Sequence, residues 1–137
     1  MKIKNIKWII CGVIVIVIGG LIVLLGIDKV NTSKMSNGMV RFVYMDKNIS
    51  KQLDGGDACF VKEMFNGKWL YKDNPSCGFS DNVSVSFDNG DNIFCIAQDS
   101  CPIIYDKSKN KYFKVSEEGI LELHEILEKY GFVFPCV

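Results

Sequence analysis

A run of twenty residues without a charged side chain, from position 8 to position 27, constrains this chain more than any other feature. It reads WIICGVIVIVIGGLIVLLGI. As an α-helix it would be about 30 Å long, which is the thickness of the hydrocarbon core of a bilayer. Inside lipid the backbone must satisfy its own hydrogen bonds, so the run is predicted to be a transmembrane helix. Residues 1–27 are therefore expected to form a membrane anchor.

Three lysines before the apolar run predict which way it crosses the membrane. Lys2, Lys4 and Lys7 are the only charged residues before position 28, and the basic residues after the run are more widely spaced. Because positively charged flanks stay in the cytoplasm, the C-terminal part is expected to be extracytoplasmic. The run exceeds the apolar region of a cleaved signal peptide, about 7–15 residues, and no pair of small cleavage-site residues follows it. We therefore predict an uncleaved signal anchor that crosses the cell membrane once, with a cytoplasmic N-terminus.

Glycines recur every seven residues within the run. Gly12, Gly19 and Gly26 would lie on one face of a helix, because seven residues are close to two turns. Small residues let a second membrane helix approach closely, so this face is predicted to pack against another membrane helix or a second copy of the chain. The alternative is the ordinary glycine content of membrane helices.

The sequence after the run predicts one small domain behind a linker. Residues 28–137 contain 13 basic and 16 acidic side chains, which gives this part a net charge of −3. Nucleic-acid binding needs a basic surface that replaces phosphate counterions, so we expect no nucleic-acid partner. The polar segment 28–38 is predicted to be a short flexible linker, and residues 39–137 an exported domain with one modest core.

Periodicity in residues 39–137 predicts an α+β domain. Val83, Val85 and Phe87 alternate with serines, which is typical of a half-buried strand. Ser116 can cap a final helix and Gly131 can end it. The predicted fold is the N-terminal transmembrane helix followed by a small antiparallel sheet meander that packs against this C-terminal helix. The predicted strands cover residues 39–45, 68–72, 83–87, 92–97, 103–106 and 112–115.

The segment 57–66, DACFVKEMFN, fits two structures. Its apolar residues recur at helical spacing and Asp57 can cap the start, so we favour a helix. Asn66-Gly67 is also a strong hairpin signal, and a pair of strands is the alternative.

Five of the six cysteines lie in the part that is predicted to be exported. Outside the cytoplasm cysteines usually form disulfides, which stabilise small domains. Cys59 is expected to be the odd thiol, buried in an apolar element. We expect at least one disulfide, in a connectivity that the sequence leaves open, among Cys77, Cys95, Cys101 and Cys136.

The same four cysteines are the candidates for metal or redox chemistry. Structural zinc usually needs C-x₂₋₄-C pairs, and Cys95 and Cys101 have five residues between them. No C-x-x-C pair is present, so we favour disulfides and expect neither a metal nor a cofactor. His124, the only histidine, is predicted to be a partly exposed residue of the final helix.

Three segments carry a resemblance to known proteins. They are SCGFSDNVSVSF (76–87), FCIAQDSCPIIY (94–105) and KYGFVFPCV (129–137). In these segments the chain resembles small, uncharacterised single-pass membrane-anchored proteins of low-GC Gram-positive bacteria. The resemblance implies an exported location and brings no activity with it.

These features support three hypotheses about function. The first is a membrane-tethered extracytoplasmic domain that binds an unidentified protein or ligand and is not an enzyme, because no catalytic constellation is recognisable. The second is an exported thiol protein, redox-active or metal-binding through the four cysteines. The third is an accessory subunit of a membrane complex that assembles through the glycine face.

Overall fold

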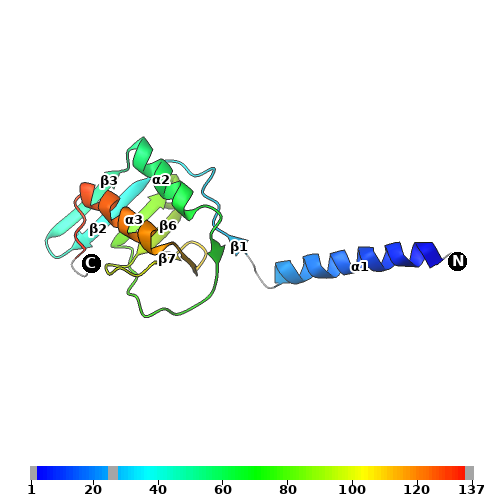
Figure 1. Cartoon of the computed structure of the whole chain (residues 1–137). Coiled ribbons are helices and arrows are strands. Elements are labelled where there is room, and N and C mark those ends of the chain that lie inside the picture. Colours follow the sequence, from blue (N-terminus) through cyan, green and yellow to red (C-terminus); the bar gives the residue numbers. More distant parts are fainter. Residues whose placement is uncertain (1–2, 25–27, 135–137) are drawn as a thin grey trace.

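The computed structural model describes residues 3–24 and 28–134 of the chain (Figure 1). It is α+β, as predicted, with an apolar N-terminal helix, antiparallel sheets of two and six strands, and a C-terminal helix. The helices are α1 (Ile3–Leu24), α2 (Gly55–Phe65) and α3 (Glu117–Lys129), and η1 (Asp88–Gly90) is a 3₁₀ turn. The strands are β1 (Asp28–Lys29), β2 (Met39–Tyr44), β3 (Lys47–Gln52), β4 (Trp69–Leu70), β5 (Val83–Phe87), β6 (Asn92–Ile96), β7 (Ile103–Asp106) and β8 (Lys111–Lys114).

Helix α1 is long and apolar enough to cross a membrane, judged by its length and composition. Its segment Ile6–Val23 has no residue buried against the rest of the described structure. A signal sequence near an N-terminus has the same properties. The structure thus agrees with the predicted helix, while its insertion and orientation stay predictions.

The six-stranded sheet has the strand order β3-β2-β5-β6-β7-β8, and every pair of neighbours is antiparallel. Strands β5 to β8 follow one another along the chain, which confirms the predicted meander. Strand β2 ends at Tyr44 rather than at Met45. Met45 has a φ of 52°, a left-handed conformation that begins the tight turn into β3.

Strand β3 is missing from the strands that the sequence predicts. Its sequence is KNISKQ, and only Ile49 among its six residues is even partly buried. It is an edge strand with one neighbour, β2, so it has little apolar surface to cover. Exposed lysines, here Lys47 and Lys51, are typical of such edges because they discourage pairing with another chain.

Helices α2 and α3 cover one face of the six-stranded sheet (Figure 1). The buried side chains on that face form one core with apolar residues of both helices. Phe65 of α2 lies at the centre, where its ring centroid is 5.1 Å from those of Phe94 and Phe113. Each such side chain contributes about 1.5–3 kcal/mol on full burial, so this core is the main source of stability.

Helix α2 confirms the helical interpretation of residues 57–66, but its cap is different from the predicted one. The carboxylate of Asp54, not Asp57, accepts a hydrogen bond from the first turn, donated by the backbone N–H of Asp57 at 2.8 Å. Helix α2 therefore begins at Gly55, two residues earlier than predicted.

Both ends of helix α3 are as predicted. The hydroxyl of Ser116 accepts a hydrogen bond from the backbone N–H of Gly119 at 2.9 Å. Gly131 has a φ of 101° and donates to the carbonyl of Glu128, while the N–H of Phe132 reaches the carbonyl of Leu127. This pair of bonds is a Schellman motif, which satisfies the last carbonyls of the helix.

Residues 28–38 are not the flexible linker that the sequence predicts. Strand β1 pairs with β4, and Val30 and Thr32 are 2% and 1% exposed. The hydroxyl of Thr32 donates to the carbonyl of Lys62 in α2 at 2.6 Å. Two buried side chains and one strand pair are enough to fix this polar segment, so the folded domain begins at Asp28.

Candidate functional site

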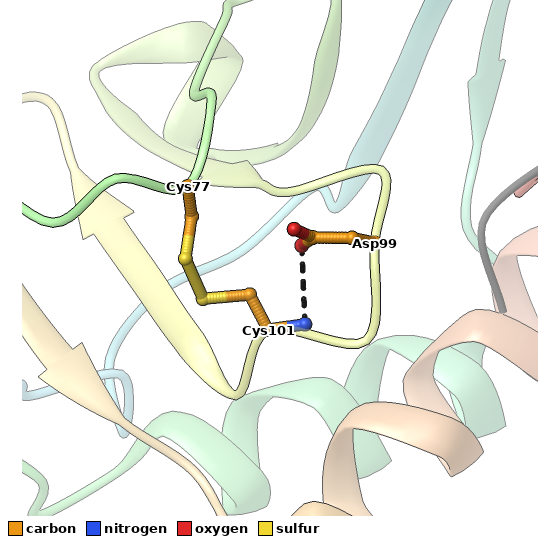
Figure 2. A group of neighbouring side chains, drawn as sticks. All are labelled: Cys77, Asp99 and Cys101. Atoms are coloured by element: carbon orange, nitrogen blue, oxygen red, sulfur yellow. Dashed lines mark hydrogen bonds between the residues drawn. A yellow bond between two sulfur atoms is a disulfide. The ribbon is translucent and has the colours of Figure 1, made fainter.

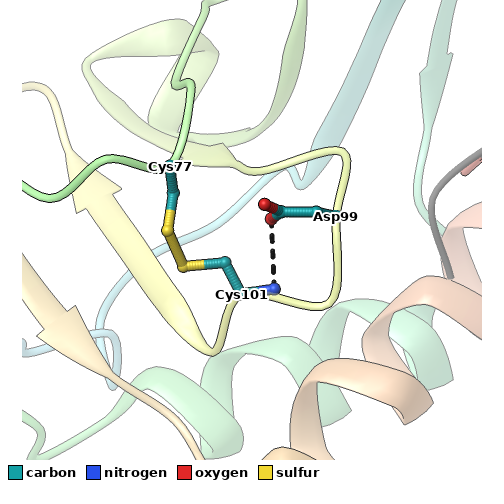
Figure 3. The surroundings of a disulfide bond; sticks show 3 residues. All are labelled: Cys77, Asp99 and Cys101. Carbon is teal, nitrogen blue, oxygen red and sulfur yellow. Dashed lines mark hydrogen bonds between the residues drawn. A yellow bond between two sulfur atoms is a disulfide. The ribbon is translucent and has the colours of Figure 1, made fainter.

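The structure joins two of the four candidate cysteines. Cys77, in the loop between β4 and β5, and Cys101, just before β7, form a disulfide with their Cα atoms 6.6 Å apart (Figure 3). The carboxylate of Asp99 accepts a hydrogen bond from the backbone N–H of Cys101 at 3.1 Å, which holds the turn beside the bridge. The disulfide thus ties the long loop 71–82 to the loop that connects β6 and β7.

The other candidate cysteines do not form disulfides in the described residues. Cys95 is a free, buried thiol whose Sγ is 3.8 Å from a carboxylate oxygen of Asp81. Burial, followed by the negative charge of Asp81, raises the pKa of Cys95 to about 12, so the thiol is protonated and inert at neutral pH. Cys136 lies outside the described residues. Cys59 is free, but it is exposed rather than buried as predicted.

Three of the four cysteines of the metal site that the sequence allows, Cys77, Cys95 and Cys101, lie in the described residues, and they do not assemble into a thiolate site. Within the described residues one group could hold a metal ion, and it consists of Cys77, Asp99 and Cys101, whose ligand atoms lie within 4.8 Å of one another (Figure 2). Its two sulfur atoms are bonded to each other, so they offer no thiolate. Cys95 lies apart from this group. The geometry favours a structural role for the bridge.

His124 is buried, and its predicted partial exposure is wrong. Its side chain is 3% exposed and stacks on Phe134 with ring centroids 3.8 Å apart. Neither ring nitrogen has a hydrogen-bond partner in the described structure. Burial lowers the pKa of His124, and the opposing effects of Asp99 and the Ala97 carbonyl are smaller. The imidazole is therefore neutral and inaccessible to a substrate.

The sheet face opposite the helices carries a continuous row of different side chains. Successive strand pairs place the following residues side by side across the sheet: Ser50, Arg41, Ser84, Cys95, Tyr105 and Tyr112. Loop 71–82 covers the tyrosine end, where the ring of Phe79 is 6.0 Å from Tyr105 and 5.6 Å from Tyr112. The arginine end is open.

A pocket of about 450 Å³ occupies the open end of this row. The strands β2, β3, β5 and β6 and the turn at η1 all contribute to its walls. Its arginine and its three serines come from alternate positions of neighbouring strands, which is why their side chains point to the same side. The residues that give the pocket its chemistry are Arg41, Ser50, Asp81, Ser84, Ser86 and Ile93.

Arg41 is the residue in this pocket that most clearly lacks a counterion. Among the described residues no carboxylate is found paired with its guanidinium, and the salt bridges of Lys107, Lys109 and Lys129 do not involve it. Asp81 lines the same pocket, but its carboxylate pairs with Lys107. The positive charge of Arg41 is therefore not neutralised from within the pocket.

Three serines line the same pocket as this charge. Ser84 is 4% exposed, and its hydroxyl donates to the backbone carbonyl of Asp81 at 2.8 Å. Ser50 is directly opposite Arg41 on β3, and Ser86 is two positions along β5 from Ser84. A guanidinium can bind a carboxylate or phosphate through two parallel N–H donors, and the hydroxyls of Ser50 and Ser86 can add further donors, whereas that of Ser84 already donates to Asp81. The arrangement is chemically suited to an oxyanion.

The pocket is not apparent from the sequence alone. Its signal was present in the serines that alternate with buried residues in β5, and in Arg41, the one arginine of the chain, between apolar residues of β2. Combining these residues requires the register of β2 with β5, which joins Arg41 to Ser84 across 42 residues of chain that hold β3, α2 and β4. No local pattern contains that information.

The predicted glycine face lies only partly within the described residues. A Cβ atom added at Gly12 or Gly19 would meet no atom within 4 Å, so both positions are open to an approaching helix. Gly26 lies outside the described residues. Packing of α1 against a second membrane helix stays a prediction.

Comparison with known proteins adds no family to these observations. No protein-family model, no curated protein and no solved structure matches the chain. The fold and the pocket define a small α+β domain behind an apolar helix, and its role has to be inferred from its own chemistry.

Proposed function

We propose that the chain is a membrane-tethered, extracytoplasmic binding domain whose ligand presents a carboxylate or phosphate group to the Arg41 pocket. Helix α1 is the tether, and the domain from Asp28 onward is the binding module. The observation that carries the proposal is the unpaired guanidinium of Arg41 in a pocket lined with serine hydroxyls. Such a charge is stabilised when an anion binds beside it.

Two features support an extracytoplasmic location. The lysines at positions 2, 4 and 7 favour a cytoplasmic N-terminus. The disulfide between Cys77 and Cys101 suits an oxidising compartment, because cytoplasmic thiols are normally kept reduced. A tether also raises the effective concentration of the domain for ligands at the membrane surface, which makes a weak single-anion site useful.

Binding fits the described residues better than catalysis does. Histidine is the most frequent general base in enzymes, and cysteine is a common nucleophile. His124 is buried beneath Phe134, and the Cys95 thiol has a pKa of about 12. Neither His124 nor Cys95 is available for chemistry at neutral pH, and the exposed thiol of Cys59 lies on α2, on the other face of the sheet from Arg41.

The proposal is tested with the full chain in detergent micelles or nanodiscs. Inorganic phosphate, glucuronate and glucose 6-phosphate should each raise the melting temperature of the wild-type domain, and uncharged glucose should not. Arg41→Gln should abolish the effect, since a charge-assisted hydrogen bond contributes about 1.5–3 kcal/mol, which corresponds to a loss of binding of roughly 10-fold to 150-fold. Arg41→Lys should retain part of it, because lysine keeps the charge but loses the two-donor geometry.

Lys51→Gln is the matched control. Lys51 lies on β3 next to Ser50, but it pairs with Val40 and so belongs to the opposite side of the sheet from Arg41. The substitution Lys51→Gln removes the same unit of positive charge as Arg41→Gln without changing the pocket, so anion binding should persist. Equal responses of wild type and Arg41→Gln to all three anions would refute the proposed site.

A further inference from the structure

We infer that one edge of the folded domain lies against the membrane and binds anionic lipid headgroups. We call it the anchor-side edge. The inference rests on the proposed tether but is independent of the Arg41 pocket. The edge is formed by β1, β4, their neighbours and the lysine that contacts β1, namely Asp28, Lys29, Lys68, Trp69, Tyr71, Lys72 and Lys109.

Chain connectivity brings this edge closest to the bilayer. Leu24 ends α1 and Asp28 begins β1, so their Cα atoms are separated by four peptide units and by at most about 15 Å. Lys29 is directly opposite Trp69 in the β1–β4 pair. Since paired strands lie about 5 Å apart, Trp69 is held within about 25 Å of the end of the apolar helix whatever path the chain takes.

Trp69 has the exposure of an interfacial residue. It is 58% exposed, and it is the one exposed aromatic residue among residues 28–134. Tyr71, two positions later and half-buried, continues its side of the strand and pairs with Tyr112 of the main sheet. Tryptophan and tyrosine are enriched at membrane–water interfaces, where an apolar ring and a polar group are both accommodated.

The charge of this edge is opposite to that of the domain. Residues 28–137 carry a net charge of −3, yet Lys29, Lys68, Lys72 and Lys109 gather here. Their acidic neighbours are Asp28, Asp73 and the buried Asp106, whose carboxylate accepts a hydrogen bond from the backbone N–H of Lys109. The ammonium group of Lys109 is 2.9 Å from the carboxylate of Asp28. Juxtamembrane lysines are attracted to anionic lipids, so this edge is complementary to such a surface.

Lys29 and Trp69 form a unit suited to headgroups. The ammonium group of Lys29 lies 4.1 Å from the ring centroid of Trp69. This cation–π contact holds a positive charge beside an exposed apolar ring. At a lipid surface the ring can enter the interface while the ammonium group meets a phosphate. Orientation of the domain on the membrane follows from these contacts.

The inference is tested by the fluorescence of Trp69 in the full chain. The chain has two tryptophans, so Trp8→Phe leaves Trp69 as the only one. This variant is reconstituted into phosphatidylcholine vesicles with and without phosphatidylglycerol, and with or without headgroup-proximal brominated lipid. With phosphatidylglycerol present, Trp69 should be quenched by the brominated lipid and shielded from aqueous acrylamide. Raising the salt concentration should reverse both effects.

Charge variants sharpen the test. Lys29→Gln should lower the ratio of domains that contact the lipid surface to domains that do not by about five-fold, which is the effect of one lysine near an anionic surface. Lys47→Gln, which removes a lysine from the outer edge strand β3, should leave the ratio unchanged. Resistance to alkaline extraction reports separately whether α1 is inserted.

Two results would overturn the inference while leaving the tether intact. In the first, α1 is inserted, acrylamide quenches Trp69 as strongly as it does in detergent, and brominated lipid does not quench Trp69. The other is shielding from acrylamide without quenching by brominated lipid, which would show that a protein surface covers the edge. A chain that alkali extracts would refute the tether and this inference together.

Discussion

His124 shows at the scale of one residue how burial decides protonation. The imidazole lies against Phe134 with no hydrogen-bond partner for either nitrogen among the described residues, and burial lowers its pKa. In the unfolded chain the same group takes up a proton below about pH 6.5. The unfolded state then binds more protons than the folded state, so folding stability falls as the pH falls through this range.

Replacing His124 should remove this component of the pH dependence. From about pH 6.5 downward, the wild-type free energy of unfolding should fall by up to about 1.4 kcal/mol per pH unit more than that of His124→Leu. Denaturant titrations of both proteins across this range measure the difference. His124 is the only histidine, so no other imidazole contributes. Parallel stability curves would contradict a buried neutral imidazole.

At the scale of structural elements, the disulfide fixes the longest irregular segment of the domain. Cys77 and Cys101 are separated by 24 positions, and their bond closes a loop that contains β5 and β6. Closing a loop of this length restricts the unfolded chain and stabilises the fold by about 3 kcal/mol. The loop that carries Phe79 over Tyr105 and Tyr112 is held by this bond.

Breaking the bridge should therefore destabilise the domain. The free energy of unfolding of the double variant Cys77→Ser, Cys101→Ser should be about 3 kcal/mol lower than that of the wild type. Reductant should lower the wild-type value by the same amount. Cys59→Ser is the matched control, because Cys59 is an exposed free thiol and its replacement should change stability little. Identical denaturation midpoints with and without reductant would argue against the bridge.

Elements with local signals could be predicted from the sequence, and elements defined by distant contacts could not. Strand β5 and helix α3 show alternation, a serine cap and a terminal glycine within short windows. Strand β3 has almost no apolar residue, because an edge strand needs little burial. Val30 and Thr32 make residues 28–38 part of the fold through hydrogen bonds with α2 and with the turn that follows it, and no pattern within the segment reveals these contacts.

The candidate site was hidden for the same reason. Arg41 and Ser84 become neighbours only when β2 pairs with β5, and the exposure of His124 depends on whether Phe134 returns to cover it. The disulfide was predictable as a class from compartment and domain size, but its partners were not. Cys95 and Cys101 are close in sequence, yet one faces Asp81 on the sheet and the other bonds Cys77.

At the scale of the whole molecule, the decisive question is which side of the membrane holds the domain. Three lysines before the apolar run, and a disulfide after it, both favour an extracytoplasmic domain. Cys59 offers a direct measurement, because its thiol is exposed on α2. Cys95 is buried with a pKa of about 12, and Cys77 and Cys101 are bonded, so these three should not react.

A membrane-impermeant maleimide should therefore label Cys59 in intact cells. The measurement is made in a Cys136→Ser background, and Cys59→Ser in that background should abolish the label. A cytoplasmic marker protein should be labelled only after the membrane is permeabilised. Positively charged flanks are retained in the cytoplasm. Replacing Lys2, Lys4 and Lys7 with glutamine removes the positive charge before the apolar run, so labelling of intact cells should decrease. Labelling of Cys59 only after permeabilisation would show that the domain is cytoplasmic, and the extracytoplasmic part of the proposed function would then be wrong.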